Sequence, residues 1–341
     1  MTQSLKDLSY LSQVRRLRLL ALEALKRYPI RARRMEFINH GENTTFCVHS
    51  EDGRKYLLRV HREGYHTALA IEEELQWLTH LSQHGFSVPK VIASRQGNVL
   101  ESVVHPGVLG PRNCCMFEWV HGRFIGKSVS VKHLQAVGRL LAGFQNSLYT
   151  VPVRHRIYWD ASGMLGDDPK FGSIDALDGA SPTEQDLITS TRHSLLQKLA
   201  AYQTRFPARM GMIHADLHFG NMVNTASGPG AIDFDDCGFG FYIYDLAIPY
   251  LSSLKLIPKS RQDQLPEIQA QFKEALFLGY RSIKPMDSHD EELFDVLVMS
   301  RKLLMLGWLN SRSDNPDIKR HLKGAITRVL ADIQNLAPDE D

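Results

Sequence analysis

The chain has 341 residues, of which 43% are hydrophobic and 23% are charged, and its formal net charge is +2 at pH 7. These values are ordinary for a globular protein that buries a core, and the length allows two domains or one large bilobal unit. The small net charge gives no indication that nucleic acid or an anionic membrane surface is a partner.

The cysteines and the distribution of apolar residues indicate in which cellular compartment the protein is expected. The chain has four cysteines, Cys47, Cys114, Cys115 and Cys237. They lack the CxxC spacing of zinc and redox sites, so we expect reduced thiols. No apolar run approaches the roughly 20 residues that span a bilayer, and the leucine-rich segment 17–25 is interrupted by charges. The sequence therefore predicts a soluble, cytoplasmic protein with no membrane partner.

The first part of the chain is expected to be rich in strands. Apolar residues at helical spacing predict helices over residues 7–28 and 68–83, ended by Pro29 and Gly85. Stretches of β-branched and aromatic residues predict strands over residues 44–49, 55–60, 88–93, 99–104 and 114–119. The first two flank Glu51-Asp52-Gly53 and should form a hairpin. The basic residues Arg31, Arg33 and Arg34 indicate a solvated face or, alternatively, a site for phosphate or an acidic partner.

The second part of the chain is expected to be mostly helical. Apolar residues recur near a period of 3.6 over residues 134–144, and helices should form over residues 184–204 and from about Asp245 onward. Residues 151–183 are richer in Gly, Pro and Asp, which is typical of a long irregular insertion. The sequence thus predicts an α+β fold with two lobes. A β-rich lobe spans residues 1–119 and includes the helix 7–28, and a larger, mostly helical lobe spans residues 120–341.

The most informative residues lie in the second lobe. They occur in MIHADLHFGNM (212–222) and AIDFDD (231–236). Asp216 precedes Asn221 by five residues, and Asp233 follows Asn221 by twelve. Ser227-Gly228-Pro229-Gly230 has turn chemistry, so Asn221 and Asp233 should lie opposite each other on neighbouring strands. An amide oxygen and a carboxylate would there suit Mg²⁺ carrying the phosphates of ATP, while Asp216 could orient a hydroxyl and accept its proton.

Each of these residues also has a simpler interpretation. His214 precedes a turn and is expected to be a structural hydrogen bonder, and Asp or Asn near a turn is often only a turn former. His214, Asp216 and His218 could instead form a zinc site. The spacing to Asn221 and Asp233 favours the phosphotransfer interpretation for the set as a whole.

The pattern HxDxHxxN, followed by IDFDD and YDLA, resembles the aminoglycoside phosphotransferase and choline kinase superfamily, which has a protein-kinase-like fold. The stretches LLRVHREGY, YWDASGMLG and IDFDDCGFGFYIYDLA are similar to the branch that contains stress response kinase A and the type II homoserine kinases. The resemblance covers about residues 37–310. It implies that Asp216 is the catalytic base and that Asn221 and Asp233 hold Mg²⁺. It also implies a buried structural role for Asp245, and it leaves the roles of Asp235 and Asp236 open.

The same resemblance implies a nucleotide site in the first lobe. Gly41, Asn43 and Thr44 lie in a turn whose backbone N–H groups could cap phosphates, although GxGxxG is absent. Arg59 stands where the family has a phosphate-contacting lysine, and the two side chains are not interchangeable. Glu74 is the expected partner of Arg59, with Glu73 as the alternative. The adenine edge should be read by the backbone carbonyl of Glu118 and the backbone N–H of Val120.

The acceptor is the least determined feature. The eleven residues between Asp233 and Asp245 are too few for a long phosphorylatable activation loop, so we expect a small molecule as acceptor. Asp160, Asp167 and Asp168 in the insertion would suit an amine or would be solvated. Amino alcohols, hydroxy amino acids such as homoserine, and aminoglycoside-like molecules are the candidates. A Ser/Thr protein kinase and a nucleotide-binding pseudokinase are the alternatives, and no oligomeric state is predicted.

Overall fold

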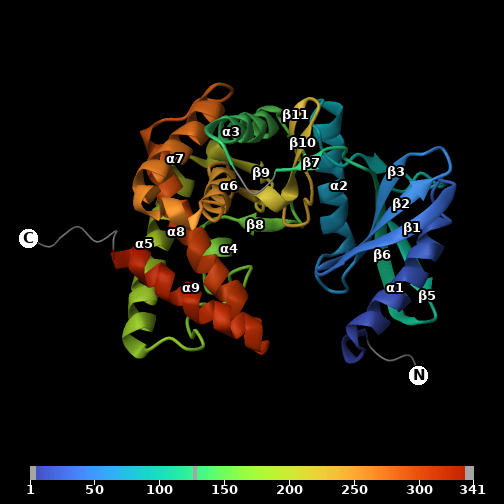
Figure 1. Ribbon diagram of the computed structural model, residues 1–341, viewed down its shortest axis with the longest axis horizontal. Coiled ribbons are helices and arrows are strands. Elements are labelled where there is room, and N and C mark those ends of the chain that lie inside the picture. Colours follow the sequence, from blue (N-terminus) through green and yellow to red (C-terminus); the bar gives the residue numbers. More distant parts are fainter. Residues whose placement is uncertain (1–4, 126–128, 335–341) are drawn as a thin grey trace, which may run out of the picture. The chain divides into compact units, whose positions relative to one another are not determined.

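The computed structural model of the chain describes residues 5–125 and 129–334 (Figure 1). The chain forms two compact units, and each unit is built from three separate stretches of sequence. Unit 1 comprises residues 1–123, 149–156 and 223–235, and unit 2 comprises residues 124–148, 157–222 and 236–341. This division is discontinuous along the chain, whereas the sequence analysis placed one boundary after residue 119.

Unit 1 is built on an antiparallel sheet with the strand order β1-β2-β3-β6-β4, in which β5 also pairs with β6. Its strands are β1 (Ala32–His40), β2 (Asn43–Ser50), β3 (Lys55–His61), β4 (Val91–Ile92), β5 (Glu101–His105) and β6 (Val108–Glu118). β1 is not predicted from the sequence, because eight of its nine residues are at least partly exposed and it shows no alternation of apolar and polar residues. The strand predicted over residues 88–93 is longer than β4, and the one predicted over residues 114–119 is shorter than β6.

Two helices lie on opposite faces of this sheet (Figure 1). The buried side of α1 (Tyr10–Leu25) belongs to the same core cluster as Leu58 and Val60 of β3. Arg59 points to the other face, because successive residues of a strand alternate, and there it contacts α2 (Ala68–Gln83). Gly85 follows the last turn of α2 and has a φ of 81°, a left-handed conformation that glycine adopts readily, so it ends α2 as predicted.

A second, three-stranded sheet has the order β11-β10-β7. Its strands are β7 (Arg123–Phe124), β10 (Met222–Thr225) and β11 (Gly228–Ala231). The predicted hairpin is present, but its turn is Ala226-Ser227, and the Gly228–Gly230 segment lies in the strand instead. Gly230 is required there by close packing, since a Cβ on it would lie 2.7 Å from the backbone oxygen of Ser87.

Unit 2 contains a small sheet with the order β8-β12-β9, surrounded by helices (Figure 1). Its strands are β8 (Ile157–Trp159), β9 (Met210–Ile213) and β12 (Gly238–Phe241). Its helices are α3 (Val131–Asn146), α4 (Ala161–Leu165), α5 (Pro182–Arg205), α6 (Tyr244–Leu254), α7 (Leu265–Arg281), α8 (Ser288–Asn310) and α9 (Pro316–Gln334). Short 3₁₀ turns are η1 (Leu5–Asp7) in unit 1 and η2 (Pro207–Arg209), η3 (Phe219–Asn221) and η4 (Lys259–Gln264) in unit 2.

The segment expected to be an irregular insertion is partly regular. It supplies β8, which pairs in parallel with β12, and the short helix α4. Trp159 is fully buried, and its Nε1 donates to the backbone oxygen of Asp236 at 2.8 Å. These elements could not be predicted from the sequence, because three to five residues are too few to establish a period.

The helices of unit 2 pack closely. A Cβ at Gly138 of α3 would lie 2.2 Å from the backbone oxygen of Leu276, and a Cβ at Gly279 of α7 would lie 2.0 Å from that of Gln135. These glycines therefore let the two helix backbones meet. The predicted fold class, an antiparallel β lobe and a larger helical lobe, is confirmed. Within residues 5–125 and 129–334, no helix is both long and apolar enough to cross a membrane.

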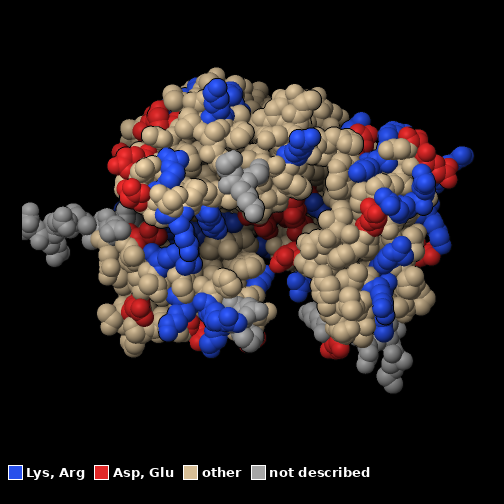
Figure 2. Space-filling model, in the orientation of Figure 1, with Lys and Arg blue, Asp and Glu red and all other residues tan. Residues whose placement is uncertain are grey.

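The basic residues near β1 lie on a solvated face. Arg31, Arg33 and Arg34 are all exposed. Arg34 is paired with Glu36 at 3.2 Å, and the neighbouring Arg54 with Asp52 at 2.6 Å. On the visible face of unit 1, basic and acidic side chains are interspersed (Figure 2). This arrangement favours the solvated-face interpretation over a binding site for phosphate.

Candidate active site

Arg59 is the centre of a buried group of charges in unit 1. Its Nη1 lies 2.7 Å from Glu74 Oε1 and 3.7 Å from Asp235 Oδ1, and its Nη2 lies 3.6 Å from Asp233 Oδ1. The guanidinium also stands over the ring of Phe117, 5.1 Å from its centre. Burial lowers the pKa of Arg59, but the three acids outweigh burial and hold that pKa well above its ordinary value. Arg59 is therefore a fixed cation.

The adjacent acids of α2 have different tasks. Glu74 is fully buried and is the partner of Arg59, as predicted. Glu73, the alternative, accepts backbone N–H groups of Arg154, His155 and Arg156 at 3.0–3.2 Å. Glu74 could be chosen over Glu73 from the sequence because it shares the buried face of α2 with Ile71 and Leu75.

Arg156 belongs to the same buried group, and sequence analysis missed it. Its Nη1 lies 4.0 Å from Glu74 Oε2 and 3.4 Å from the backbone oxygen of Ala70, and its Nη2 donates to the backbone oxygen of Asp235. It comes from a segment that Glu73 anchors and that unit 1 includes. Nothing in the local sequence distinguishes this arginine from a solvated one.

The predicted phosphate turn joins β1 and β2. Gly41 and Glu42 form the connection, and Gly41 N–H donates to the backbone oxygen of Asn43 at 2.9 Å. The Asn43 side-chain oxygen accepts the backbone N–H of Arg62 at 3.3 Å, and the buried Thr44 hydroxyl contacts His40 Nδ1 at 2.7 Å. The side chains of Asn43 and Thr44 thus stabilise the turn itself.

The predicted adenine-reading residues border a cavity in unit 1. The cavity has a volume of about 480 Å³. Glu118 and Val120 line it from one side and Thr225, Ala226 and Ser227 from the other. Gly122 lies against the hairpin, since a Cβ there would be 2.7 Å from the backbone oxygen of Asn224. The segment expected to read adenine therefore faces open space of suitable size.

In unit 2, the loop that carries Asp216 is held by a buried carboxylate. Asp245, in the first turn of α6, accepts the backbone N–H of His214 at 2.9 Å and that of Ala215 at 2.7 Å. Ala215 has a φ of 63°, the left-handed conformation that a side chain rarely adopts. Burial raises the pKa of Asp245 to about 7 despite these two bonds. The structural role expected for Asp245 is confirmed.

The Asp216 carboxylate has one strongly bonded oxygen and one that is less engaged. Arg301 Nη2 donates to Oδ1 at 2.7 Å. On the other oxygen, Oδ2, His218 Nε2 lies at 3.6 Å and Asn221 Nδ2 at 3.5 Å. The side chain of Asp216 is 24% exposed, so it remains accessible. Arg301 was not among the residues predicted for the site, and it lies 85 residues away in α8.

Asn221 and Asp233 each present an oxygen suited to a hard cation. Asn221 Nδ2 donates to the backbone oxygen of Asp216 at 3.0 Å, which leaves the amide oxygen available. Asp233 has a φ of 60° and a carboxylate that is 56% exposed. Within the described residues, Asp235 Oδ1 is buried without a hydrogen-bond partner, so it is a further candidate ligand. Amide and carboxylate oxygens are ligands that Mg²⁺ prefers, so each of these residues taken by itself suits such a cation.

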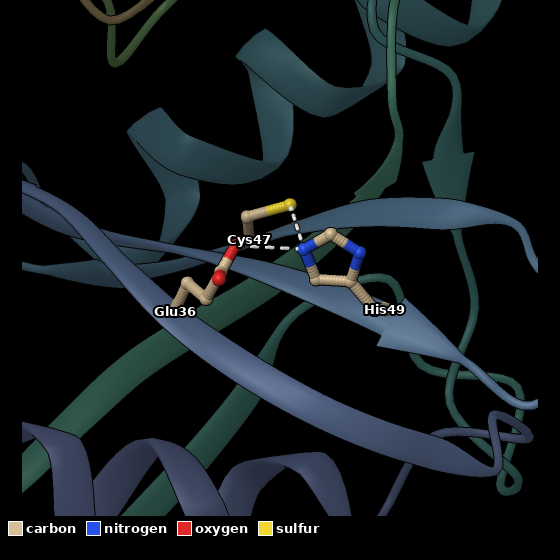
Figure 3. Close-up of side chains that lie close together, drawn as sticks. All are labelled: Glu36, Cys47 and His49. Atoms are coloured by element: carbon tan, nitrogen blue, oxygen red, sulfur yellow. Dashed lines mark hydrogen bonds and ion pairs between the residues drawn. The ribbon is translucent and has the colours of Figure 1, made fainter.

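A zinc site at His214, Asp216 and His218 is not formed by the described residues. Among them, the group of three potential ligands that does come together is Glu36, Cys47 and His49 on β1 and β2 (Figure 3). His49 Nε2 lies 2.8 Å from Glu36 Oε2 and 3.5 Å from Cys47 Sγ. Burial raises the pKa of Cys47, and Arg34 already pairs with Glu36, so this group is better explained as an ion pair than as a metal centre.

Two of the three acids proposed to meet an amine are used within the fold. Asp160 caps α4 by accepting the N–H of Gly163 at 2.8 Å. Asp167 pairs with Arg192 at 3.3 Å, although its side chain is fully exposed. Asp168 is exposed. The arrangement therefore gives no preference for these acids as an amine site.

Comparison with known sequences places the fold and the motifs in one family. Residues 34–286 match the phosphotransferase enzyme family. Amicoumacin kinase of Bacillus subtilis (strain 168) is 25% identical, over 93% of this chain and 91% of that protein. Homoserine kinase of Methylobacterium sp. (strain 4-46) is 26% identical, over 79% of this chain and 78% of that protein.

Solved structures show the same architecture. A microcompartment-associated aminopropanol kinase has a TM-score of 0.79 and 30% identity, covering 93% of this chain and 96% of that one. An amicoumacin kinase in complex with AMP-PNP and Ca²⁺ has a TM-score of 0.76 and 24% identity, covering 92% of each chain. Each similarity covers more than nine tenths of this chain.

Proposed function

The chain belongs to the phosphotransferase enzyme family, and on that premise we propose that it transfers the γ-phosphoryl group of Mg·ATP to a hydroxyl of a small amino alcohol or hydroxy amino acid. The observation that carries this proposal is the Asp216 carboxylate, which Arg301 binds through one oxygen only and whose side chain is partly exposed. A carboxylate in this state can orient a hydroxyl without being consumed by the fold.

In the proposed reaction, the acceptor hydroxyl donates a hydrogen bond to Asp216. The hydroxyl oxygen forms a bond to the γ-phosphorus, the bond from that phosphorus to the bridging oxygen breaks, and its electron pair remains on the ADP oxygen. The hydroxyl proton passes to Asp216. Positioning and charge stabilisation supply most of the rate enhancement in such transfers.

The nucleotide contacts are assigned by the same proposal. Arg59 would neutralise charge on the phosphates, with Glu74 holding it in place, and the backbone of Gly41, Asn43 and Thr44 would cap them. The Glu118 carbonyl and the Val120 N–H would bind adenine. Asn221 and Asp233 would hold Mg²⁺, which supplies positive charge to the phosphates when bound.

One feature of unit 2 favours an acceptor that also carries a carboxylate. Lys255 follows α6, and one turn earlier Ser252 Oγ accepts the N–H of Phe219 in the loop after Asp216. The end of α6 therefore lies against that loop. Lys255 remains accessible to solvent and has no ion pair within the described residues. Partial burial first, and then Arg301, lower its pKa, while Asp216 raises it. A cation at this place would attract the carboxylate of a hydroxy amino acid, which a plain amino alcohol lacks, so we expect the hydroxy amino acid to be the better acceptor.

The decisive experiment gives Mg·ATP to the purified protein with homoserine, 1-amino-2-propanol, an aminoglycoside, amicoumacin or a generic protein. ADP release and labelled product are followed for each acceptor. Stimulation by one small molecule that is lost in Asp216→Asn is the expected result. Homoserine preferred over aminopropanol, with the preference lost in Lys255→Met, would support the carboxylate preference. Nucleotide binding without transfer would contradict the proposal and favour a pseudokinase.

A protein kinase remains the second candidate, because the sequence resembles the branch of stress response kinase A. Labelling of the protein acceptor alone would support it. The four cysteines are free and buried, which agrees with the proposed cytoplasmic location. The proposal assigns no nucleic-acid or membrane partner to the chain.

A further inference from the structure

Arg301 is buried next to the residue proposed to receive the acceptor proton. It lies in the second half of α8, and its side chain is only 10% exposed. Nη2 donates to Asp216 Oδ1 at 2.7 Å, and Nη1 donates to the hydroxyl of Tyr244 at 3.1 Å. The guanidinium also stands over the ring of Phe171, 5.5 Å from its centre. Three contacts therefore fix the plane of the guanidinium.

A fixed guanidinium restricts the carboxylate that it binds. A hydrogen bond between an ionised donor and an ionised acceptor is stronger than a neutral one, and it is directional. With Oδ1 bonded to Arg301, rotation of the Asp216 carboxylate is limited. The other oxygen, Oδ2, has contacts of only 3.5 Å or longer to Asn221 and His218. Oδ2 is thus the oxygen available to an acceptor.

We propose that Arg301 is a positioning residue that holds Asp216 Oδ1 and thereby presents Oδ2 to the acceptor hydroxyl. This inference rests on the proposed function of Asp216. It assigns the two oxygens different tasks, one to anchor the carboxylate and one to orient the hydroxyl and accept its proton. Arg301 itself touches neither the phosphates nor the acceptor in this assignment, so its removal should act on turnover and not on nucleotide binding.

An ion pair of purely structural value would look similar, and the chain offers a matched control. Asp287 caps the N-terminal end of α8, and its carboxylate accepts hydrogen bonds from Arg209 of η2. The two hydrogen bonds measure 2.8 Å and 2.7 Å. This pair also joins an arginine to an aspartate of unit 2, and neither residue has a role in the proposed reaction. Arg209→Met therefore reports what the loss of such a pair does to stability alone.

The experiment compares wild type, Arg301→Met, Arg301→Lys and Arg209→Met, with the acceptor that gives turnover or, failing one, with water in Mg·ATP hydrolysis. We expect Arg301→Met to lower kcat by about 100-fold, the size of effect that misplaced catalytic groups produce, while KM for ATP stays within about twofold. Arg301→Lys should recover part of kcat. Arg209→Met should lower the melting temperature and leave kcat unchanged.

A second comparison tests whether Arg301 acts through Asp216. In the Asp216→Asn background, Arg301→Met should cause little further loss of residual turnover. The proposal would be overturned if Arg301→Met caused as large a loss in the Asp216→Asn background as in the wild type. It would also be overturned if kcat were unchanged in Arg301→Met, or if the KM for ATP rose as kcat fell.

Failure of the proposed function would be seen separately, as absence of phosphoryl transfer by the wild type. Crystal structures of wild type and Arg301→Met would then decide the positioning role. A rotated or disordered Asp216 carboxylate in the variant is expected, and an unchanged orientation would contradict the inference.

Discussion

The charged groups around Arg59 and around Asp216 are arranged with opposite signs. In unit 1, a buried cation has three acids within 4 Å, and one of them, Glu74, is completely buried. In unit 2, a partly exposed acid is held by one buried cation, Arg301. In the group around Arg59, the buried charges stabilise one another, and none of them would be stable in the interior alone. In the second group, the second carboxylate oxygen has only longer contacts, and the side chain is partly exposed.

This difference separates stability from chemistry. A buried charge that loses its partner costs much free energy, because the remaining charge stays away from water. Asp216 is partly exposed, and an asparagine in its place still offers an oxygen to the buried Arg301, so this replacement should cost less stability. We therefore expect variants of the Arg59 group to unfold more easily, and Asp216→Asn to keep most of the stability but lose turnover.

The largest expected effect is on turnover. Asp216→Asn should lower kcat by about 10³-fold, because the amide cannot accept the hydroxyl proton, with the melting temperature and ATP binding nearly unchanged. Steady-state kinetics and calorimetric titration with ATP would measure both. Asp295→Asn, which alters an exposed acid of α8 paired with Lys273, is the control and should retain wild-type kcat. Near-normal turnover in Asp216→Asn would show that the assigned role is wrong.

Glu74→Gln tests the other half of the comparison. Arg59 and Arg156 would both lose a negative neighbour in the interior, so the free energy of unfolding should fall by about 3–5 kcal/mol. Denaturant unfolding would measure the loss. Glu72→Gln, on the same helix but outside the group, should have little effect. A Glu74→Gln protein as stable as wild type would indicate that the buried charges are already compensated by other contacts.

Asp233→Ala should have a smaller effect, confined to metal-dependent binding. We expect ATP binding in the presence of Mg²⁺ to weaken by about tenfold, as when a metal site is damaged, while binding without Mg²⁺ is not weakened. The reason is that Asp233 would bring a negative charge to the metal but repel the phosphates. Titrations with and without Mg²⁺ would measure both values, and an unchanged dependence on Mg²⁺ would argue against Asp233 as a ligand.

The last prediction concerns the pH dependence of stability. The pKa of Asp245 is raised to about 7 in the folded protein, above its ordinary value of 3.8. The folded state therefore binds more protons than the unfolded state between these values, and this group's contribution to stability is lost as pH rises through that window. Asp245→Asn removes the ionisation. The difference in unfolding free energy, variant minus wild type, should increase from about pH 4 to 7, by at most about 1.4 kcal/mol per pH unit. A constant or decreasing difference would contradict the raised pKa.

The motif residues could be identified from sequence because their spacing is short. Asp216, Asn221 and Asp233 are separated by a loop and a hairpin whose chemistry the sequence displays, and the partner of Arg59 was chosen from the periodicity of α2. Arg156 and Arg301 could not be found in this way. Each contacts the site from a segment distant in sequence, and an arginine in such a segment has no local pattern that marks it as buried.

The sequence by itself determined the family, the α+β class and the residue types of the site, because these depend on local periodicity and on the chemistry of short motifs. Tertiary structure decided which charges meet. It buries Arg59 among three acids, places Arg301 on one oxygen of Asp216, and turns the apparent insertion into β8 and α4. The physical reason is that burial and hydrogen bonding depend on neighbours brought together by folding, whereas spacing along the chain constrains only neighbours a few residues apart.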